Sequence, residues 1–171
     1  RLRSLRKSVD KHPGLPDNRN TKLRAEGPRL SRFGRGEWEE TMRIITGTAR
    51  GRKLTAPEGL TARPTTEIVK EAVFSAIHFE VPGARVLDLF AGSGQMGLEA
   101  LSREAQSAVF VENARVCLDA VRGNVSACGF EDKARVLAMD ASAYIQSSGD
   151  TFDIAFLDPP YGEGILEAVL P

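Results

Sequence analysis

Residues 84–103 read ARVLDLFAGSGQMGLEALSR, and this stretch decides the fold. It opens with a short apolar run, 84–90, of the kind that forms a buried strand, and then takes the apolar spacing of a helix. Between the two, Gly92, Gly94 and Gly97 fit the pattern G-x-G-x-x-G. This pattern predicts a tight turn from a strand into a helix whose N-terminus faces a ligand, although the glycines alone do not say which ligand.

The alternation of strand and helix continues from this stretch to the end of the chain. Repeated strand–helix units predict an α/β fold of the Rossmann-like type, a doubly wound parallel sheet with helices on both faces. The expected strands are 84–90, 108–112, 134–139 and 152–157, and the expected helices are 95–103, 114–128, 141–148 and one that starts at 164.

The chain before the sheet differs from the rest in composition and in predicted structure. Residues 1–41 are rich in Arg, Lys, Gly, Pro and Asn without an apolar period, so we expect a disordered basic extension. Residues 42–82 predict a β-hairpin with a basic tip near 47–51, followed by a helix that Thr65 caps. The expected apolar face of that helix is Ile68, Ala72, Ala76 and Phe79.

Charge is balanced over the whole chain but not along it. The net charge is +5 over 1–41, +2 over 42–82 and −7 over 83–171, which favours a polyanion as the partner of the N-terminal part. Cys117 and Cys128 fall in one expected helix, roughly 16 Å apart at the usual rise, too far for a disulfide. Nothing indicates a metal site, and the two cysteines favour a reducing, cytoplasmic compartment.

Acidic residues lie at the carboxyl ends of three successive expected strands: Asp88, Glu112 and Asp140. The carboxyl ends of parallel strands meet at one edge, where such sheets bind ligands. A carboxylate at Asp88 would repel a pyrophosphate but attract the ammonium and sulfonium groups of S-adenosylmethionine (SAM). Glu112 can accept both ribose hydroxyls, and Asp140 can accept from the adenine amine while capping the next helix, unless it is a helix cap alone. With Gly92 and Gly94, these acids predict a SAM site.

The fourth expected strand ends in Asp158-Pro159-Pro160-Tyr161 on the same edge. The Asp158 carboxylate and the Pro159 carbonyl can accept both N–H bonds of an exocyclic amine and turn its lone pair toward a methyl group. The prolines hold the loop extended without adding donors. Tyr161 offers a ring on which a flipped base can stack. Asp158, Pro159 and Tyr161 are therefore the expected catalytic residues.

These motifs resemble those of the SAM-dependent amino-methyltransferases that carry a (D/N)PP(Y/F) motif. More closely, the chain is similar to the bacterial family that methylates the N2 amine of guanine in small-subunit (16S) ribosomal RNA. The resemblance covers about 42–171 and rests on MRIITGTARGRKL, RPTTEIVKEAVF, VLDLFAGSGQMGLEALSR, VFVE and FDIAFLDPPY. It implies a class I methyltransferase fold with the strands in the spatial order third, second, first, fourth.

The same resemblance implies a cofactor, a partner and roles for residues. SAM is the implied cofactor, and ribosomal RNA within an assembling small subunit is the implied partner. The site near SAM is then Asp88, Gly92, Gly94, Glu112 and Asp140, with 158–161 around the guanine. The hairpin would contact RNA phosphates, unless it is merely a solvated charged surface, through Arg43, Arg50, Arg52, Lys53 and Arg63.

The chain also departs from the family pattern. Ile68 and Lys70 stand where the family usually has arginines, and Gln95-Met96 replaces small apolar residues after the glycines. The family continues with three more strands, so we expect 83–171 to be an incomplete SAM-binding domain that is inactive alone.

Three other functions stay open. One is methylation of adenine N6 or another amino group, whose families more often carry Asn at the position of Asp158. Another is a non-catalytic RNA-binding protein with this fold, against which Asp88, Glu112 and Asp158 argue. The third is a dinucleotide-dependent oxidoreductase, disfavoured by Asp88. The sequence gives neither the modified nucleotide nor the oligomeric state.

Overall fold

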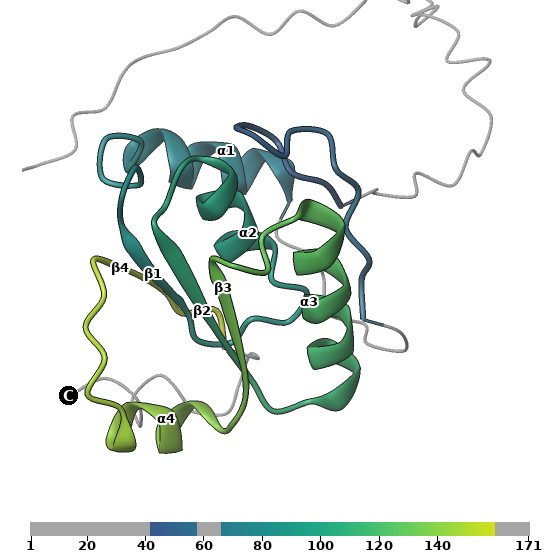
Figure 1. Cartoon of the computed structure of the whole chain (residues 1–171). Helices are drawn as coiled ribbons and strands as arrows, with labels where there is room; N and C mark the ends of the chain where they lie inside the picture. Colours follow the sequence, from purple (N-terminus) through teal and green to yellow (C-terminus); the bar gives the residue numbers. More distant parts are fainter. Residues whose placement is uncertain (1–41, 58–65, 160–171) are drawn as a thin grey trace, which may run out of the picture. The chain divides into compact units, whose positions relative to one another are not determined.

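The computed structural model describes residues 42–57 and 66–159, which lie in one compact unit. Its sheet has the strand order β3-β2-β1-β4, with every pairing parallel (Figure 1). The strands are β1 (Arg85–Asp88), β2 (Ser107–Glu112), β3 (Ala134–Ala138) and β4 (Ile154–Phe156). Both the parallel sheet and the expected spatial order are confirmed.

Helices cover both faces of this sheet. They are α1 (Glu67–Ala76), α2 (Gln95–Ser102), α3 (Arg115–Cys128) and α4 (Ala141–Ser147). Neighbouring residues of a strand point to opposite faces, so Val86 packs with side chains of α1, α2 and α3, whereas Leu87 packs with side chains of α4. The doubly wound arrangement is confirmed. No helix among the described residues is long and apolar enough to cross a membrane.

Helix ends follow local chemistry. Gly129 ends α3 in the left-handed conformation at φ 72°, as its position after the apolar period predicts. Cys117 and Cys128 lie in this helix as free thiols. The expected extension 1–41 and the helix expected from 164 lie outside the described residues.

Segment 42–57 folds back on itself as a hairpin without regular strands. Arg43 and Lys53 form an isolated antiparallel bridge, and the Leu54 N–H donates to the Met42 carbonyl at 2.7 Å. Met42, Ile44 and Leu54 are buried in the same hydrophobic cluster as Val86 and Phe110 of the sheet. The segment expected to contact RNA is therefore also part of the core.

The predicted apolar face of α1 is wrong. Ile68 and Phe79 are 79% and 83% exposed, whereas Phe74 and Lys70 are 0% and 1% exposed. The Phe74 ring meets the ring of Phe156 in β4, with 5.5 Å between centroids. The buried face of α1 includes Lys70. Its charge is the reason that the sequence predicted a different face.

Lys70 can be buried here because its alkyl stem and its ammonium group have different partners. Its alkyl stem packs in the core, and its Nζ donates to the Arg43 carbonyl at 2.6 Å. Burial lowers the pKa of the Lys70 ammonium, an effect opposed by the nearby carboxylates of Glu99 and Glu67. The helix cap is Thr66 rather than Thr65, with the Thr66 hydroxyl accepting from the Val69 N–H at 3.4 Å.

Candidate functional site

The glycine-rich loop joins the end of β1 to the start of α2. Gly92 and Gly94 have φ values of 56° and 77°, in the left-handed region that favours glycine. Gly97 has a different reason, because a Cβ there would lie 2.3 Å from the Phe110 ring of β2. The first two glycines therefore shape the turn, and the third lets α2 approach the sheet.

Asp88 lies at the end of β1, beneath this loop. Its side chain is buried, and Oδ2 accepts from the Gly97 N–H in the first turn of α2 at 3.0 Å. Burial raises the pKa of the Asp88 carboxyl to about 7; the Gly97 hydrogen bond opposes the rise, and Asp158 and Glu112 add to it. A carboxylate in this position is stabilised by a cation.

Glu112, at the end of β2, holds the loop from the other side. Its Oε2 accepts from the Gly92 N–H at 2.9 Å, and its Oε1 accepts from the Asn113 and Ala114 N–H groups, each at 2.9 Å. This loop-holding role was missed by the sequence reasoning, which assigned Glu112 to a ligand alone. These three backbone bonds leave one acceptor position, on Oε2, for a hydroxyl group.

The two remaining acids lie on strands at opposite sides of the sheet. Asp140 follows β3, and its side chain caps α4 by accepting from the Ala143 N–H at 3.0 Å, so its expected capping role is confirmed. Asp158 follows β4 and is exposed, close enough to Asp88 to raise that group's pKa. Pro159 is half-buried, and Tyr161 lies outside the described residues.

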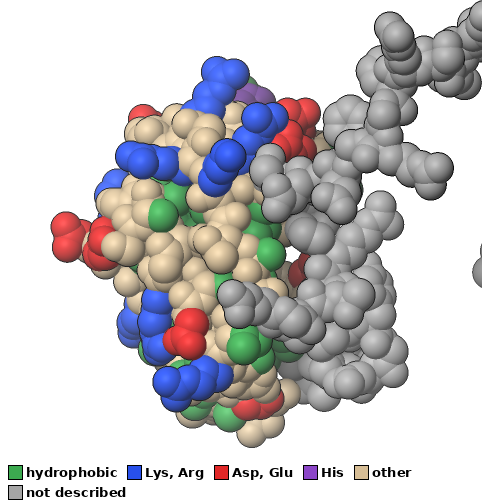
Figure 2. All heavy atoms as spheres, turned by 90° about the vertical axis from the view of Figure 1, so that its right-hand side faces the viewer, with side chains coloured by type: hydrophobic (Ala, Val, Ile, Leu, Met, Phe, Trp, Pro, Cys, Tyr) green, Lys and Arg blue, Asp and Glu red, His purple; other side chains and the backbone are tan. Residues whose placement is uncertain are grey.

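The expected RNA-binding side chains divide into two kinds. Arg43 forms a two-pronged ion pair with Glu67, at 2.8 and 3.1 Å. Arg50, Arg52 and Lys53 are exposed and form no ion pair with another described residue. Figure 2 looks onto the side where segment 42–57 and α3 lie, and shows Lys and Arg side chains gathered at its upper end. Arg63 lies outside the described residues.

Buried polar side chains that the sequence did not single out fasten segment 42–57. Glu99 of α2 is 0% exposed and accepts from the Ile45 and Thr46 N–H groups at 2.8 and 3.0 Å. Ser102 accepts from the Ala49 N–H at 3.0 Å. A polar residue within a helical period is ordinarily expected to face solvent, so neither contact could be predicted from the sequence.

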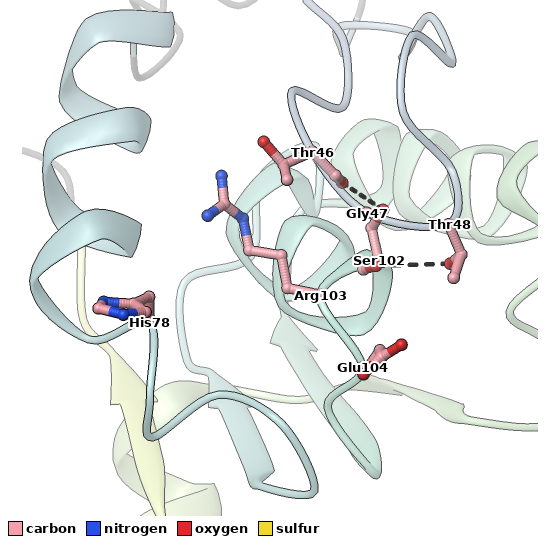
Figure 3. A pocket seen from close by; sticks show the side chains of 7 residues that line it. All are labelled: Thr46, Gly47, Thr48, His78, Ser102, Arg103 and Glu104. Atoms are coloured by element: carbon pink, nitrogen blue, oxygen red, sulfur yellow. Dashed lines mark hydrogen bonds between the residues drawn. The ribbon is translucent and has the colours of Figure 1, made fainter.

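A pocket lies at the other end of α2 (Figure 3). Its wall comes from the turn of segment 42–57, the end of α1 and the end of α2, and it includes none of the predicted site residues. The Ser102 hydroxyl donates to the Thr46 carbonyl at 2.5 Å across this wall. The lining residues are Thr46, Gly47, Thr48, His78, Ser102, Arg103 and Glu104.

Known proteins are similar to this chain in sequence and in fold. Ribosomal RNA small subunit methyltransferase D of Escherichia coli is 39% identical over 129 residues, covering 75% of this chain and 65% of the relative. The protein of that name from Haemophilus influenzae is 34% identical over 133 residues, covering 75% and 68%. The solved structure of Escherichia coli yhhF is 40% identical with a TM-score of 0.68, covering 75% of this chain and 71% of that one.

A parallel sheet with a glycine-rich loop and carboxylates along one edge makes this a Rossmann-like α/β protein with the fold of class I methyltransferases. The model of the family described as "Conserved hypothetical protein 95" matches residues 42–171. The chain belongs to that family. It spans about two thirds of the length of the two curated relatives named above.

Proposed function

We propose that the protein transfers a methyl group from SAM to the N2 amine of a guanine in small-subunit ribosomal RNA. The observation that carries this proposal is the buried Asp88 beneath the glycine loop, with Asp158 near it, just after the neighbouring strand β4. One acid favours a cationic cofactor, and the other is exposed for an amine. Curated relatives named ribosomal RNA small subunit methyltransferase D support the choice of RNA.

The residues around the loop fit SAM by their chemistry. Asp88 would hold a positive charge, since ligand cations offset the cost of a buried carboxylate. Glu112 would accept one ribose hydroxyl at Oε2, where capacity is left after its three backbone contacts, and Asp140 would accept from the adenine amine. The open space beside Gly92 leaves the backbone approachable. SAM supplies an electrophilic methyl group when bound.

The acceptor side would act on the amine. The Asp158 carboxylate and the Pro159 carbonyl accept its two N–H bonds, which orients the nitrogen lone pair, and Tyr161 stacks on the base. Arg50, Arg52 and Lys53 contact backbone phosphates and set the register of the RNA. We also propose that the substrate is the assembling small subunit and that the protein acts in the cytoplasm.

Two measurements test the function. Equilibrium binding should give measurable affinity for SAM and none for NAD at the same concentration. With SAM and a version of the protein as long as its relatives, small subunits from a strain that lacks the corresponding methyltransferase should gain N2-methylguanosine, detected by nucleoside analysis. N6-methyladenosine instead would favour the rival amino-methyltransferase. SAM binding without transfer to RNA by a version as long as the relatives would favour a non-catalytic role.

The RNA contacts have a separate test with a matched control. Neutralising Arg50, Arg52 and Lys53 together should lower the slope of log affinity against log salt by about three, close to one per lost phosphate contact. Neutralising Arg43, which is paired with Glu67, should change that slope much less. Equal slopes in the triple variant and the unaltered protein would mean that this surface only scaffolds the core.

A further inference from the structure

Asn124 of α3 joins two parts of the molecule that are distant in sequence. It is 1% exposed, and its Oδ1 accepts from the Thr55 N–H at 2.7 Å. Its Nδ2 donates to the Thr55 carbonyl and to the Ser93 carbonyl, each at 2.9 Å. One side-chain amide therefore binds segment 42–57 and the glycine loop together.

A second contact ties the same loop residue to the same segment. The Ser93 hydroxyl donates to the Met42 sulfur at 3.2 Å. Met42 and Leu54 are joined by a backbone hydrogen bond of 2.7 Å, so Met42 lies opposite the strand-like stretch that ends at Thr55. The base of the hairpin, rather than its basic tip, is what contacts the loop.

The chemistry at this point requires an amide. The site presents one backbone donor and two backbone acceptors to a buried side chain. An asparagine matches this set, whereas an aspartate has no donor for the carbonyls and a leucine leaves all three groups without a partner. A buried polar group left without a partner is costly, so the identity of the side chain matters more than its size.

We propose that Asn124 is a positioning residue that holds the glycine loop in its ligand-binding conformation by fastening Ser93 to segment 42–57. The identity of the ligand as SAM rests on the proposed function. Glu112 holds the loop at Gly92 and Asp88 holds the following helix at Gly97, so Asn124 and Met42 supply the support between these points. Segment 42–57 is thereby part of the cofactor site.

The test compares Asn124→Ala with Ser102→Ala in the full chain. Ser102 is also buried and also fastens segment 42–57, through Ala49 and Thr46, but at the far end of α2. Both variants lose hydrogen bonds to the same segment, so both should lower thermal stability. Only the first loses a contact to the glycine loop.

Amide hydrogen exchange without ligand is the first readout. In Asn124→Ala the amides of Gly92, Gly94 and Gly97 should exchange about tenfold faster, beyond any change in β1 and β2. Ser102→Ala should leave the ratio of loop to strand exchange unchanged. Equal ratios in the two variants would overturn the proposal, and this readout stands whether or not SAM is the ligand.

Cofactor binding is the second readout. Asn124→Ala should weaken SAM binding about tenfold. In a version of the protein as long as its relatives, it should raise the KM for SAM while kcat at saturating SAM stays nearly unchanged, and Ser102→Ala should change neither the affinity nor the KM. Absence of SAM binding in the unaltered chain as well would count against the proposed function alone. If Asn124→Ala does not fold, Asn124→Ser replaces it, and a loop-to-strand exchange ratio no higher than in Ser102→Ala again overturns the proposal.

Discussion

The two halves of the candidate site are held in very different ways. The glycine loop and the start of α2 are fixed by buried or half-buried side chains at Gly92, Ser93 and Gly97. Asp158, by contrast, is exposed and follows β4, which pairs only with β1 among the described strands. The residues expected to hold the cofactor are thus pre-organised, whereas the residue expected to hold the amine follows an edge strand of the described sheet.

This difference predicts that mutations in the two halves act on different measurements. Pre-organised groups contribute to affinity because little ordering remains when the ligand binds. A group on a weakly held loop contributes when the complete complex forms, so its loss appears in turnover. The four changes below separate affinity, turnover, stability and pH dependence.

Asp158→Ala should have the largest effect. In a version of the protein as long as its relatives, the rate of methyl transfer should fall at least about a hundredfold, the scale seen when one group that stabilises a transition state is removed. SAM affinity should stay within several-fold, because the loop contacts do not involve Asp158.

Asp158→Asn is the matched control for this change. It keeps one side-chain oxygen as an acceptor, so it should retain more activity than Asp158→Ala in the same assay. Full turnover by the alanine variant would remove Asp158 from the acceptor site.

Glu112→Ala should act on affinity. It removes the acceptor for a ribose hydroxyl, and a charged hydrogen bond of this kind contributes about 1.5–3 kcal/mol. It also leaves the Gly92, Asn113 and Ala114 amides without their side-chain acceptor. SAM binding measured by calorimetry should weaken roughly tenfold to a hundredfold. Glu112→Gln should be nearly as damaging, since one of its ends would present an N–H to backbone N–H groups. Unchanged affinity in both variants would make Glu112 a bystander.

Gly97→Ala tests why the third glycine of the motif is there. A Cβ would overlap the Phe110 ring at 2.3 Å, and overpacking of this kind costs about 1–3 kcal/mol of unfolding free energy. Gly123→Ala in α3 is the control: nothing lies within 4 Å of its Cβ, and the helix should gain about 1 kcal/mol. Denaturant unfolding measures both, and Phe110→Leu should recover part of the loss in Gly97→Ala.

The sequence predicted the sheet because its strands and helices repeat with clear apolar periods. The prediction failed for α1, where Lys70 is buried against the core while the more apolar Ile68 is exposed, as is Phe79 just after the helix. The acids and glycines at the strand ends were found because parallel strands bring those ends to one edge. Their roles toward ligands stay predictions.

The fastening contacts could not be predicted, because their partners are backbone groups far away in sequence. Glu99 binds Ile45 across 54 positions, and Asn124 binds Thr55 across 69. Helical spacing gives a polar residue an exposed face by default, and no side-chain pattern marks a backbone amide as its partner. Such residues emerge once the path of segment 42–57 is known.

Asp88 should give the smallest effect and a distinct pH signature. Its folded-state pKa of about 7 lies above its ordinary value of 3.8, so the folded protein binds this proton more tightly than the unfolded chain does. Its contribution to stability is therefore present at low pH and is lost as the pH rises from about 4 to about 7, with little further change above. Asp88→Asn, which keeps an acceptor for the Gly97 N–H, should flatten this part of the stability curve.

Cofactor binding should show the opposite trend with pH. A cation binds the ionised form of Asp88, and the ionised fraction rises from about one tenth at pH 6 to about nine tenths at pH 8 for a pKa of about 7. SAM affinity should therefore increase by up to about tenfold over this range, because the affinity follows the ionised fraction of Asp88. Calorimetric titrations at pH 6, 7 and 8 measure the trend, and Asp88→Asn should bind more weakly with almost no pH dependence. An equally steep rise of SAM affinity with pH in Asp88→Asn would assign the titration to another group. It would also contradict the expected role of Asp88 in binding the cofactor.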